Sequence, residues 1–509
     1  MASLKTSVIT NVLGQLYVAA IGIVMVPAYV RYMGIEAYGL IGFFIALQTW
    51  FALLDMGISP TLIREISRFR AGAASREEVW LFIRSAEWLF LLLGVLSCTA
   101  IVLCSSWISL HWLRLQEIGV AEAANCIAMM GAMVGVRWLA SLYRSGLTGM
   151  DCLPVVNLSA VVLATLRSFV VLAVLAWYSQ RIEVFFAYQM LIAALEVLLL
   201  RRLFLLRFPG MELAPFWPRF RSLGLVFRFA GAMALLALIW GVISQADRLV
   251  LSHYLSLAAY GSYAVAMVAA SGVSLLATPL IQAVQPRMVF LAAGENAPAV
   301  HELYRTSTQL LMCLLLVVAG SAAVFAEPIL RVWTGNAALA AQMAPVLALY
   351  ALGNALLALS SLIFQLQYAC GLVRRHVLGS LGFGVIWVPL MCLIAIRHGA
   401  IGTAWAWFAG NLLFFILWML GTQRRLMPGQ TMNWLWADVL RGPLAAAPVY
   451  LLFIFALPLA VGRLGVAMEI GACAILAALT GMLASPRLRA QAGAGWRRYR
   501  VSAGKRIDE

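Results

Sequence analysis

The sequence predicts an all-α membrane protein with about fourteen transmembrane helices, and three observations support this fold class. The 509 residues are 64% hydrophobic and only 11% charged, and their mean hydropathy is +0.94. Apolar runs long enough to span a bilayer recur from one end of the chain to the other. Most lysine and arginine residues lie between these runs, where they encode orientation. A soluble protein of this length could not bury so much apolar surface.

The expected helices follow these apolar runs, and none of the connecting loops is long enough to form a separate folded domain. The first run lacks the pattern of a cleavable signal peptide, so we expect it to remain as a span. The approximate ranges of the spans are 9–30, 38–58, 85–106, 119–142, 154–178, 184–204, 223–245, 258–283, 306–326, 341–365, 376–396, 399–420, 439–459 and 464–485.

Basic residues are distributed unevenly between the two sides of the predicted bundle. With the N-terminus placed in the cytoplasm, 27 of the 36 lysines and arginines fall on the cytoplasmic side and 7 on the outer side. The other two, Arg137 and Arg167, lie within spans. This asymmetry predicts that both termini are cytoplasmic. It also explains the net charge of +16 without a nucleic-acid partner, and it favours contact with anionic membrane lipids.

A short internal repeat relates the two halves of the chain. Ala37-Tyr38-Gly39 matches Ala259-Tyr260-Gly261, and each copy opens the second helix of a helical pair. The two copies lie 222 residues apart, a separation that contains six predicted helices. Because six is an even number, both halves cross the membrane in the same direction. Parallel repeats of this kind build transporters in which substrate binds near the midplane between two bundles.

The repeat predicts four regions. We expect a first six-helix lobe at residues 1–207, a second at 208–425, and an extra terminal helix pair at 426–485. Residues 486–509 form a basic tail, which we interpret either as a solvated cytoplasmic end or as an anchor to the lipid surface.

The segments around the repeat resemble a known family. The first reads Pro27-Ala-Tyr-Val-Arg-Tyr-Met-Gly-Ile-Glu-Ala-Tyr-Gly-Leu40 and leads to Leu53-Leu-Asp-Met-Gly57. The second reads Gln245-Ala-Asp-Arg-Leu-Val-Leu251 and leads to Ala259-Tyr-Gly-Ser-Tyr-Ala-Val-Ala266. Over residues 5–425 the chain resembles the polysaccharide-export branch of the multidrug/oligosaccharidyl-lipid/polysaccharide (MOP) exporter superfamily, and most of all the O-antigen flippases of the Wzx type.

This resemblance implies a function and a location. It implies twelve core helices in two lobes (as in the MATE exporters of the superfamily) that work by alternating access. The implied cargo is an undecaprenyl-diphosphate-linked oligosaccharide, moved from the cytoplasmic to the periplasmic leaflet of the bacterial inner membrane. Polysaccharide polymerase machinery is an implied partner. The terminal helix pair departs from the twelve-span pattern, and fourteen spans also occur in lipid II flippases.

Arg167 is the first candidate for contact with such a cargo. It lies about 11 residues, or roughly 16 Å, from the nearer end of its span, too far for its side chain to reach the headgroups easily. Insertion of arginine at this depth costs roughly 2.5–3.5 kcal/mol, so the side chain is expected to face protein or water. Arginine suits a diphosphate because its planar fork bonds phosphate oxygens in pairs. The alternative is a structural ion pair, for which Glu196 is available.

Four further arginines are candidates for substrate binding, each with a structural alternative. Arg137 lies in the inner half of the fourth span and either faces substrate or reaches the cytoplasmic interface. Arg64 follows the second span and is either at the cytoplasmic mouth or a positive-inside anchor. Arg31 and Arg248 occupy the outer ends of equivalent helices, where they either receive the diphosphate or make interfacial pairs.

Other polar and backbone features suggest coupling and motion. Asp55 and Asp247 end the second and seventh spans, and each either binds a coupling Na⁺ or H⁺ or forms salt bridges. Pro27 and Pro279 lie within spans and act either as hinges between lobes or as static kinks. No other cofactor is expected, and the eight cysteines show no metal-ligand spacing.

Three function classes compete. A lipid-linked oligosaccharide flippase needs a cationic site, which the midplane arginines provide. A multidrug exporter of the same architecture should present carboxylates to cationic drugs. A membrane enzyme, such as a polymerase or ligase, should carry a large outer catalytic loop, and the predicted spans leave no loop of that size. The chain also contains no nucleotide-binding or hydrolase motif in a suitable context. The sequence therefore favours the flippase.

Overall fold

The computed structural model describes residues 4–55, 57–208, 224–294, 296–455 and 462–490. Within these ranges the chain is almost wholly helical and contains no β-strand, apart from an isolated bridge between Arg114 and Ser256. The predicted all-α class is confirmed.

Twelve helices among the described residues are long and apolar enough to cross a membrane. One of them, Val373–Leu426, has 54 residues, or about 80 Å, and its helical course is broken at Gly399, where φ is 58° and ψ is −148°. This segment is therefore long enough for two crossings. Helix α10 (Gly224–Tyr254) has 31 residues and supplies one more. The helices agree with the expected number of about fourteen.

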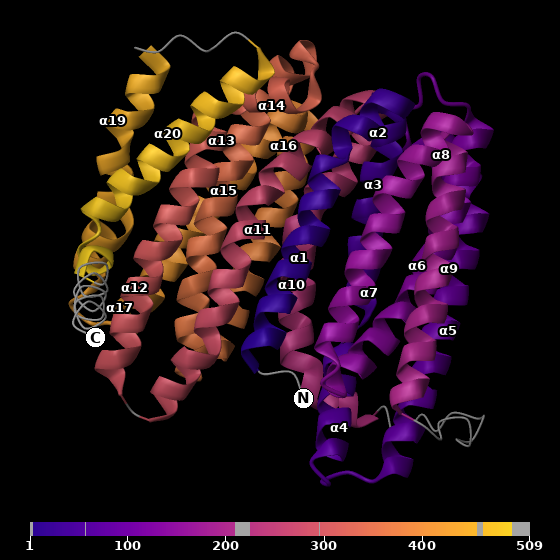
Figure 1. The fold of residues 1–509 in the computed structure, drawn as a ribbon, viewed down its shortest axis with the longest axis horizontal. Coiled ribbons are helices and arrows are strands. Elements are labelled where there is room, and N and C mark those ends of the chain that lie inside the picture. Colours follow the sequence, from indigo (N-terminus) through magenta and orange to yellow (C-terminus); the bar gives the residue numbers. More distant parts are fainter. Residues whose placement is uncertain (1–3, 56, 209–223, 295, 456–461, 491–509) are drawn as a thin grey trace, which may run out of the picture. The chain divides into compact units, whose positions relative to one another are not determined.

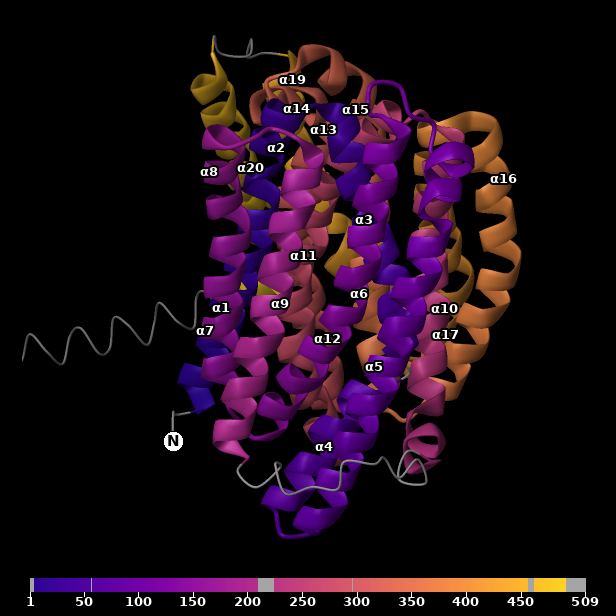
Figure 2. The ribbon, with the colours of Figure 1, turned by 90° about the vertical axis from the view of Figure 1, so that its right-hand side faces the viewer.

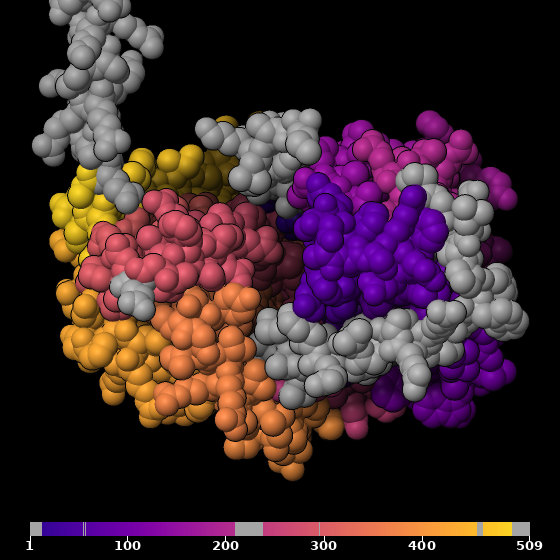
Figure 3. Space-filling model, turned by 90° about the horizontal axis from the view of Figure 1, so that it is seen from below, coloured from indigo at the N-terminus to yellow at the C-terminus, as the bar shows by residue number. Residues whose placement is uncertain are grey.

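The chain forms two compact units. Unit 1 contains residues 1–264 and 384–399, and unit 2 contains residues 265–383 and 400–509. In unit 1, α6 packs against both α5 and α9, and the three run alongside one another (Figures 1 and 2). The turn between α4 and α5 lies at the lower end of unit 1 in Figure 1, and Figure 3 shows this end from below. Besides α10, the helices of unit 1 are α1 (Leu4–Val24), α2 (Val26–Met33), α3 (Ile35–Ala52), α4 (Ile58–Arg70), α5 (Arg76–Trp107), α6 (Val120–Gly149), α7 (Leu153–Thr165), α8 (Val171–Trp177) and α9 (Ile182–Arg207).

Unit 2 includes the terminal helix pair, α19 (Arg441–Phe455) and α20 (Arg463–Ala484). These two helices pack on each other and on the α12 region through a small apolar core that includes Leu316, Tyr450 and Cys473. Helices α11 (Leu257–Ala293) and α16 (Val373–Phe414) contribute to both units. The remaining elements are α12 (Ala297–Leu315), η6 (Leu316–Gly320), α13 (Ser321–Val324), α14 (Ala326–Thr334), α15 (Ala337–Ala369), η7 (Phe415–Met419), α17 (Leu420–Leu426), α18 (Thr431–Trp434) and η8 (Leu435–Leu440).

The two copies of the repeated Ala-Tyr-Gly motif cross each other within unit 1. A Cβ atom added at Gly39 would collide with the carbonyl oxygen of Leu257, and one added at Gly261 would collide with that of Ile35. One turn further on, a Cβ atom at Gly42 would lie 2.7 Å from the Cβ of Ala264. Each glycine therefore lets its helix approach the backbone of the other copy, as at close helix crossings stabilised by Cα–H···O contacts. This crossing explains why both copies of the motif contain glycine.

Replacing Gly39 or Gly261 by alanine should destabilise the protein, because the added methyl group meets backbone that cannot move aside. We expect a loss of about 1–3 kcal/mol, seen as a lower midpoint of thermal unfolding in detergent. Gly22 is the matched control, since it is also helical and a Cβ atom there meets nothing within 4 Å. Equal midpoints for Gly39→Ala and Gly22→Ala would contradict the close crossing.

Candidate functional site

In the interior of unit 1, one buried carboxylate forms ion pairs with two arginines. The side chain of Glu196, on α9, is only 7% exposed. Its Oε2 accepts a hydrogen bond from the Arg167 guanidinium at 2.8 Å, and its Oε1 accepts one from Arg144, on α6. Arg167 thus makes the ion pair with Glu196 that the sequence offered as a structural alternative. The Arg167 side chain remains 29% exposed and that of Arg144 45% exposed, so the pairing leaves both accessible.

Arg137 completes this cluster from α6. Its guanidinium carbon lies 5.5 Å from the centre of the Phe44 ring, a cation–π contact, and it interacts electrostatically with Arg167, Glu196 and Arg144. Two guanidinium groups therefore bond one carboxylate and a third lies beside them, so the group carries a net charge of +2. We call Arg137, Arg144, Arg167 and Glu196 the arginine cluster.

A break in regular helix geometry places Arg167. Residues 166–170 form a π-helical turn, η3, between α7 and α8. Two side chains of α9 bond carbonyl groups of this turn: the Tyr188 hydroxyl donates to Leu166 O at 2.9 Å, and the Gln189 amide donates to Arg167 O at 3.2 Å. Single π-helical turns inside α-helices occur frequently at functional sites. Here the turn and its two bonds orient Arg167 toward α9.

The unpartnered buried polar atoms of α3 to α9 have one chemical character. In the described residues of α3 to α9, the buried side-chain atoms without a hydrogen-bond partner are all nitrogens that donate. Phe44, Gln48 and Phe51 follow one face of α3, and this face packs on α6 at Arg137 and Trp138. Among these nitrogens, Arg137 Nε and Arg167 Nε belong to the arginine cluster, and Gln48 Nε2 lies on this face of α3. A surplus of buried donors beside a net positive charge is suited to an anion.

The other predicted arginines lie on helices outside this cluster. Arg64 is on α4, with a side chain 45% exposed and 3.8 Å from a carboxylate oxygen of Glu65. Arg31 is exposed in the last turn of α2, and Arg248 is on α10 beside Asp247. Their substrate roles stay predictions.

The two predicted coupling carboxylates have different surroundings. Asp55 precedes α4 and bonds its first turn: its oxygens accept hydrogen bonds from Ser59 N at 3.3 Å and from the Ser59 hydroxyl at 2.9 Å. Burial raises the pKa of Asp55 above its usual value, and these hydrogen bonds act in the opposite direction. Asp247 is almost fully buried and accepts hydrogen bonds from the Tyr263 hydroxyl at 2.7 Å and from Arg248 N at 2.8 Å. Both carboxylates therefore have structural duties in unit 1.

The two predicted hinge prolines also differ. Pro27 lies in the first turn of α2, immediately after the break that separates α2 from α1. Pro279 lies inside α11, which continues past it to Ala293. Only the first coincides with an interruption of its helix, and the hinge roles of both stay predictions.

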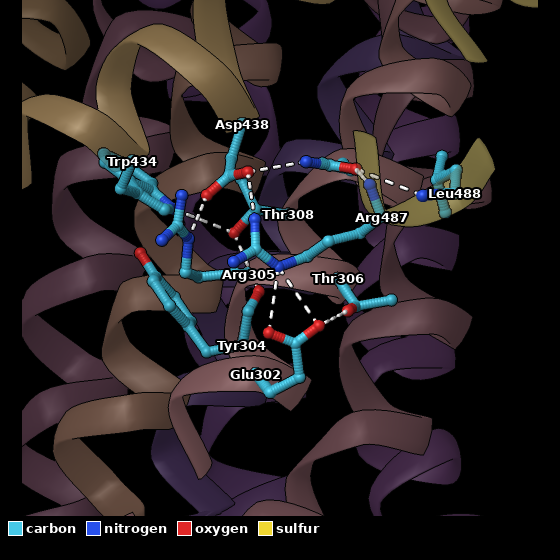
Figure 4. A network of polar contacts seen from close by, with 10 residues as sticks. Glu302, Tyr304, Arg305, Thr306, Thr308, Trp434, Asp438, Arg487 and Leu488 are labelled. Atoms are coloured by element: carbon cyan, nitrogen blue, oxygen red, sulfur yellow. Dashed lines mark hydrogen bonds and ion pairs between the residues drawn. The ribbon is translucent and has the colours of Figure 1, made fainter. Parts of the chain in front are cut away.

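Sequence reasoning missed a buried ionic network in unit 2 (Figure 4). The fully buried carboxylate of Asp438, in η8, accepts hydrogen bonds from Arg305 Nε at 2.5 Å, from Gln309 Nε2 at 2.6 Å and from Arg487 at 3.1 Å. Arg487 also bonds Glu302 of α12 at 3.0 Å. The segment after α20 is thereby tied to α12, although its position in the sequence indicated only the start of a basic tail.

Comparison with known proteins identifies the type of fold. The sequence profile of a family described as "Polysaccharide biosynthesis protein" matches residues 4–292. No curated protein is significantly similar in sequence.

Several solved structures share the fold at low sequence identity. An inward-facing multidrug resistance MATE family transporter of the MOP superfamily is 14% identical, with a TM-score of 0.68 over 82% of this chain and 98% of that chain. The lipid II flippase MurJ, in an inward closed conformation, is 13% identical, with a TM-score of 0.71 over 93% of this chain and 98% of that chain. A MOP superfamily transporter from Pyrococcus furiosus, described as having a binding pocket of reverse polarity, is 15% identical, with a TM-score of 0.57 over 83% and 96%. The fold is that of MOP superfamily transporters.

Removing the carboxylate of the arginine cluster should destabilise unit 1. Glu196→Gln leaves three guanidinium groups without a counter-charge, and we expect a loss of about 3 kcal/mol or more, measured as the midpoint of thermal unfolding. The control is Glu327→Gln, which breaks an exposed pair with Arg331 and should cost less than about 1 kcal/mol. If Glu196→Gln unfolds at the same temperature as this control, the carboxylate does not hold the cluster together.

Proposed function

We propose, since the chain belongs to the polysaccharide biosynthesis protein family, that it is a flippase for a polyprenyl-diphosphate-linked oligosaccharide. It moves this lipid from the cytoplasmic to the periplasmic leaflet of the bacterial inner membrane, and both of its termini are cytoplasmic. The observation that carries the proposal is the arginine cluster, a net charge of +2 among unsatisfied N–H donors inside a membrane-spanning bundle.

The chemistry of the cargo explains why such a cluster is useful. The head of a lipid-linked sugar diphosphate is anionic and cannot cross hydrocarbon unaided, because a buried unpaired charge is very costly. Arg167 lies about 15 Å of helix from the end of its span at Trp177, which is bilayer depth. Guanidinium groups stay charged there and bind phosphate oxygens in pairs. The cluster thus replaces water around the diphosphate during passage.

Glu196 holds the arginines when no cargo is present. A carboxylate and a diphosphate oxygen offer similar acceptors, so an incoming diphosphate can replace Glu196 as partner of Arg144 and Arg167. Arg137 already has an unsatisfied Nε and receives the anion without giving up a hydrogen bond. Binding of the diphosphate therefore requires little rearrangement at Arg137. Alternating access of the two lobes then exposes the bound headgroup to the opposite face of the membrane.

Lipid II-type cargo is the second candidate, and one observation favours it. The match to the lipid II flippase covers 93% of this chain, against 82% for the MATE transporter. The difference, 11% of 509 residues or about 56, is close to the length of the terminal helix pair. A cationic drug is a poorer cargo, because Glu196 is already paired with two guanidinium groups.

Translocation in proteoliposomes tests the proposal directly. A polyprenyl-diphosphate-linked oligosaccharide is incorporated, and its appearance on the far leaflet is followed with an impermeant glycosidase. Arg137→Gln should lower the initial rate at least about ten-fold, because a charge-assisted hydrogen bond contributes roughly 1.5–3 kcal/mol. Arg137→Lys should keep part of the rate, since the charge remains.

The matched control is Arg181→Gln, which removes an exposed arginine outside the cluster and should leave the rate unchanged. Equal rates for the wild type, Arg137→Gln and Arg181→Gln would remove the cluster from the path of the substrate. Parallel assays with lipid II and with a cationic dye identify the cargo, and transport of the dye alone would replace the flippase by an exporter.

A further inference from the structure

A short loop between α5 and α6 is hydrogen-bonded to both copies of the repeated motif. It follows the π-helical turn η2 (Ile108–Trp112), runs to Glu117 and lies wholly in unit 1. In the proposed topology this loop follows the third span, and residues 252–257 follow the seventh, so both lie on the outer side of the membrane. We call residues 112–117 the outer loop.

On the side of the first copy, one carboxylate binds the outer loop. Glu36, in the first turn of α3, is only 3% exposed. Its Oε1 accepts a hydrogen bond from Gln116 N and its Oε2 accepts one from Glu117 N, both at 2.6 Å. Hydrogen bonds to an ionised acceptor are roughly twice as strong as those between neutral groups. A carboxylate bonded through both oxygens therefore attaches the loop firmly to the start of α3.

On the side of the second copy, the acceptors are uncharged hydroxyl and carbonyl oxygens. Trp112 Nε1 donates to the Ser252 hydroxyl at 3.0 Å. His253 Nδ1 lies 3.1 Å from Trp112 O, and because a carbonyl oxygen only accepts, this nitrogen carries the hydrogen. Leu257 N donates to Arg114 O at 2.9 Å, which satisfies an amide at the start of α11 that has no partner within its own helix. Each of these bonds is weaker than a bond to Glu36.

The glycine crossing continues directly from these bonds. Leu257 takes part in both, since its N–H binds Arg114 O and its carbonyl oxygen would collide with a Cβ atom at Gly39. Arg114 and Ser256 also form the isolated bridge. The outer loop and the crossing therefore make one contact that joins α3 to the start of α11. Helix α10 begins the predicted second lobe, and its inclusion in unit 1 agrees with this contact being closed in the structure.

We infer that the outer loop is a clasp, which holds the outer ends of the two repeats together and releases only on the side of the second copy. The inference rests on the proposed function, because cargo bound at the arginine cluster can leave on the outer side only if the repeats separate there. Release breaks the bonds to Ser252, His253 and Leu257. Glu36 keeps the loop on α3, so the loop is in place when the repeats close again.

Hydrogen–deuterium exchange of the purified full-length protein, without cargo, tests which side releases. After correction for intrinsic rates, the Leu257 amide should exchange at least about ten-fold faster than the amides of Gln116 and Glu117. The reason is that an amide exchanges only when its hydrogen bond opens, and the bonds to Glu36 stay closed. Overlapping peptides across residues 112–118 and 254–260 resolve these amides.

A reversible cross-link tests whether release is required for transport. Arg114→Cys combined with Ser256→Cys places two thiols across the isolated bridge, where paired backbones are about 5 Å apart. A short bifunctional thiol reagent, which a reducing agent removes, links them. The linked protein should translocate the lipid-linked oligosaccharide at least about ten-fold more slowly in proteoliposomes, because the outer ends cannot separate, and reduction should restore the rate. The link should also remove the faster exchange of the Leu257 amide.

The control is Glu327→Cys combined with Arg331→Cys, an exposed pair within α14. A link there spans one turn of a single helix and should leave the rate unchanged. The wild type treated with the same reagent accounts for the native cysteines.

Two results would overturn the inference. One is equal exchange of the Leu257, Gln116 and Glu117 amides that the link does not alter. The other is translocation by the fully linked protein at the rate of the unlinked protein. The exchange measurement needs no cargo, so it tests the clasp by itself. Failure of the flippase proposal would instead appear as absent translocation by the unlinked wild type.

Discussion

A guanidinium group at the depth of the hydrocarbon core is tolerated only where protein groups or water replace its lost hydration. In unit 1 this constraint determines the local structure. Glu196 supplies the only carboxylate bonded to Arg144 and Arg167 in the described chain, and the π-helical turn 166–170 orients Arg167 toward it. Because this one carboxylate is the counter-charge beside three arginines and bonds only two of them, the charge is reduced but not cancelled. The remaining positive charge makes the arginine cluster suited to binding an anion.

Much of the fold could be predicted from the sequence, because membrane crossing depends on local composition. The apolar runs predict the helices, and the two Ala-Tyr-Gly segments, which the structure brings into contact, predict the repeat. For Arg167 the sequence offered two roles, substrate contact and a structural ion pair with Glu196 in the next span, and the structure shows the ion pair. The contribution of Arg144 was not predicted, since its position near the end of a span is equally typical of an orientation signal.

Other parts of the site depend on tertiary contacts that no local pattern reveals. Asp438 is separated from Arg305 by 133 residues and from Arg487 by 49, so their meeting follows from how α12, η8 and the segment after α20 pack. The π-helical turns likewise have no residue signature that would have identified them.

The reciprocal glycine contact couples the two copies of the motif sterically. Gly39 accommodates the backbone of the second copy, and Gly261 accommodates that of the first. A larger side chain at either position would therefore push both helices of the crossing apart at once. Neither glycine can be replaced by a larger residue without affecting the segment that carries the other, so the two tripeptides depend on each other although 222 residues separate them.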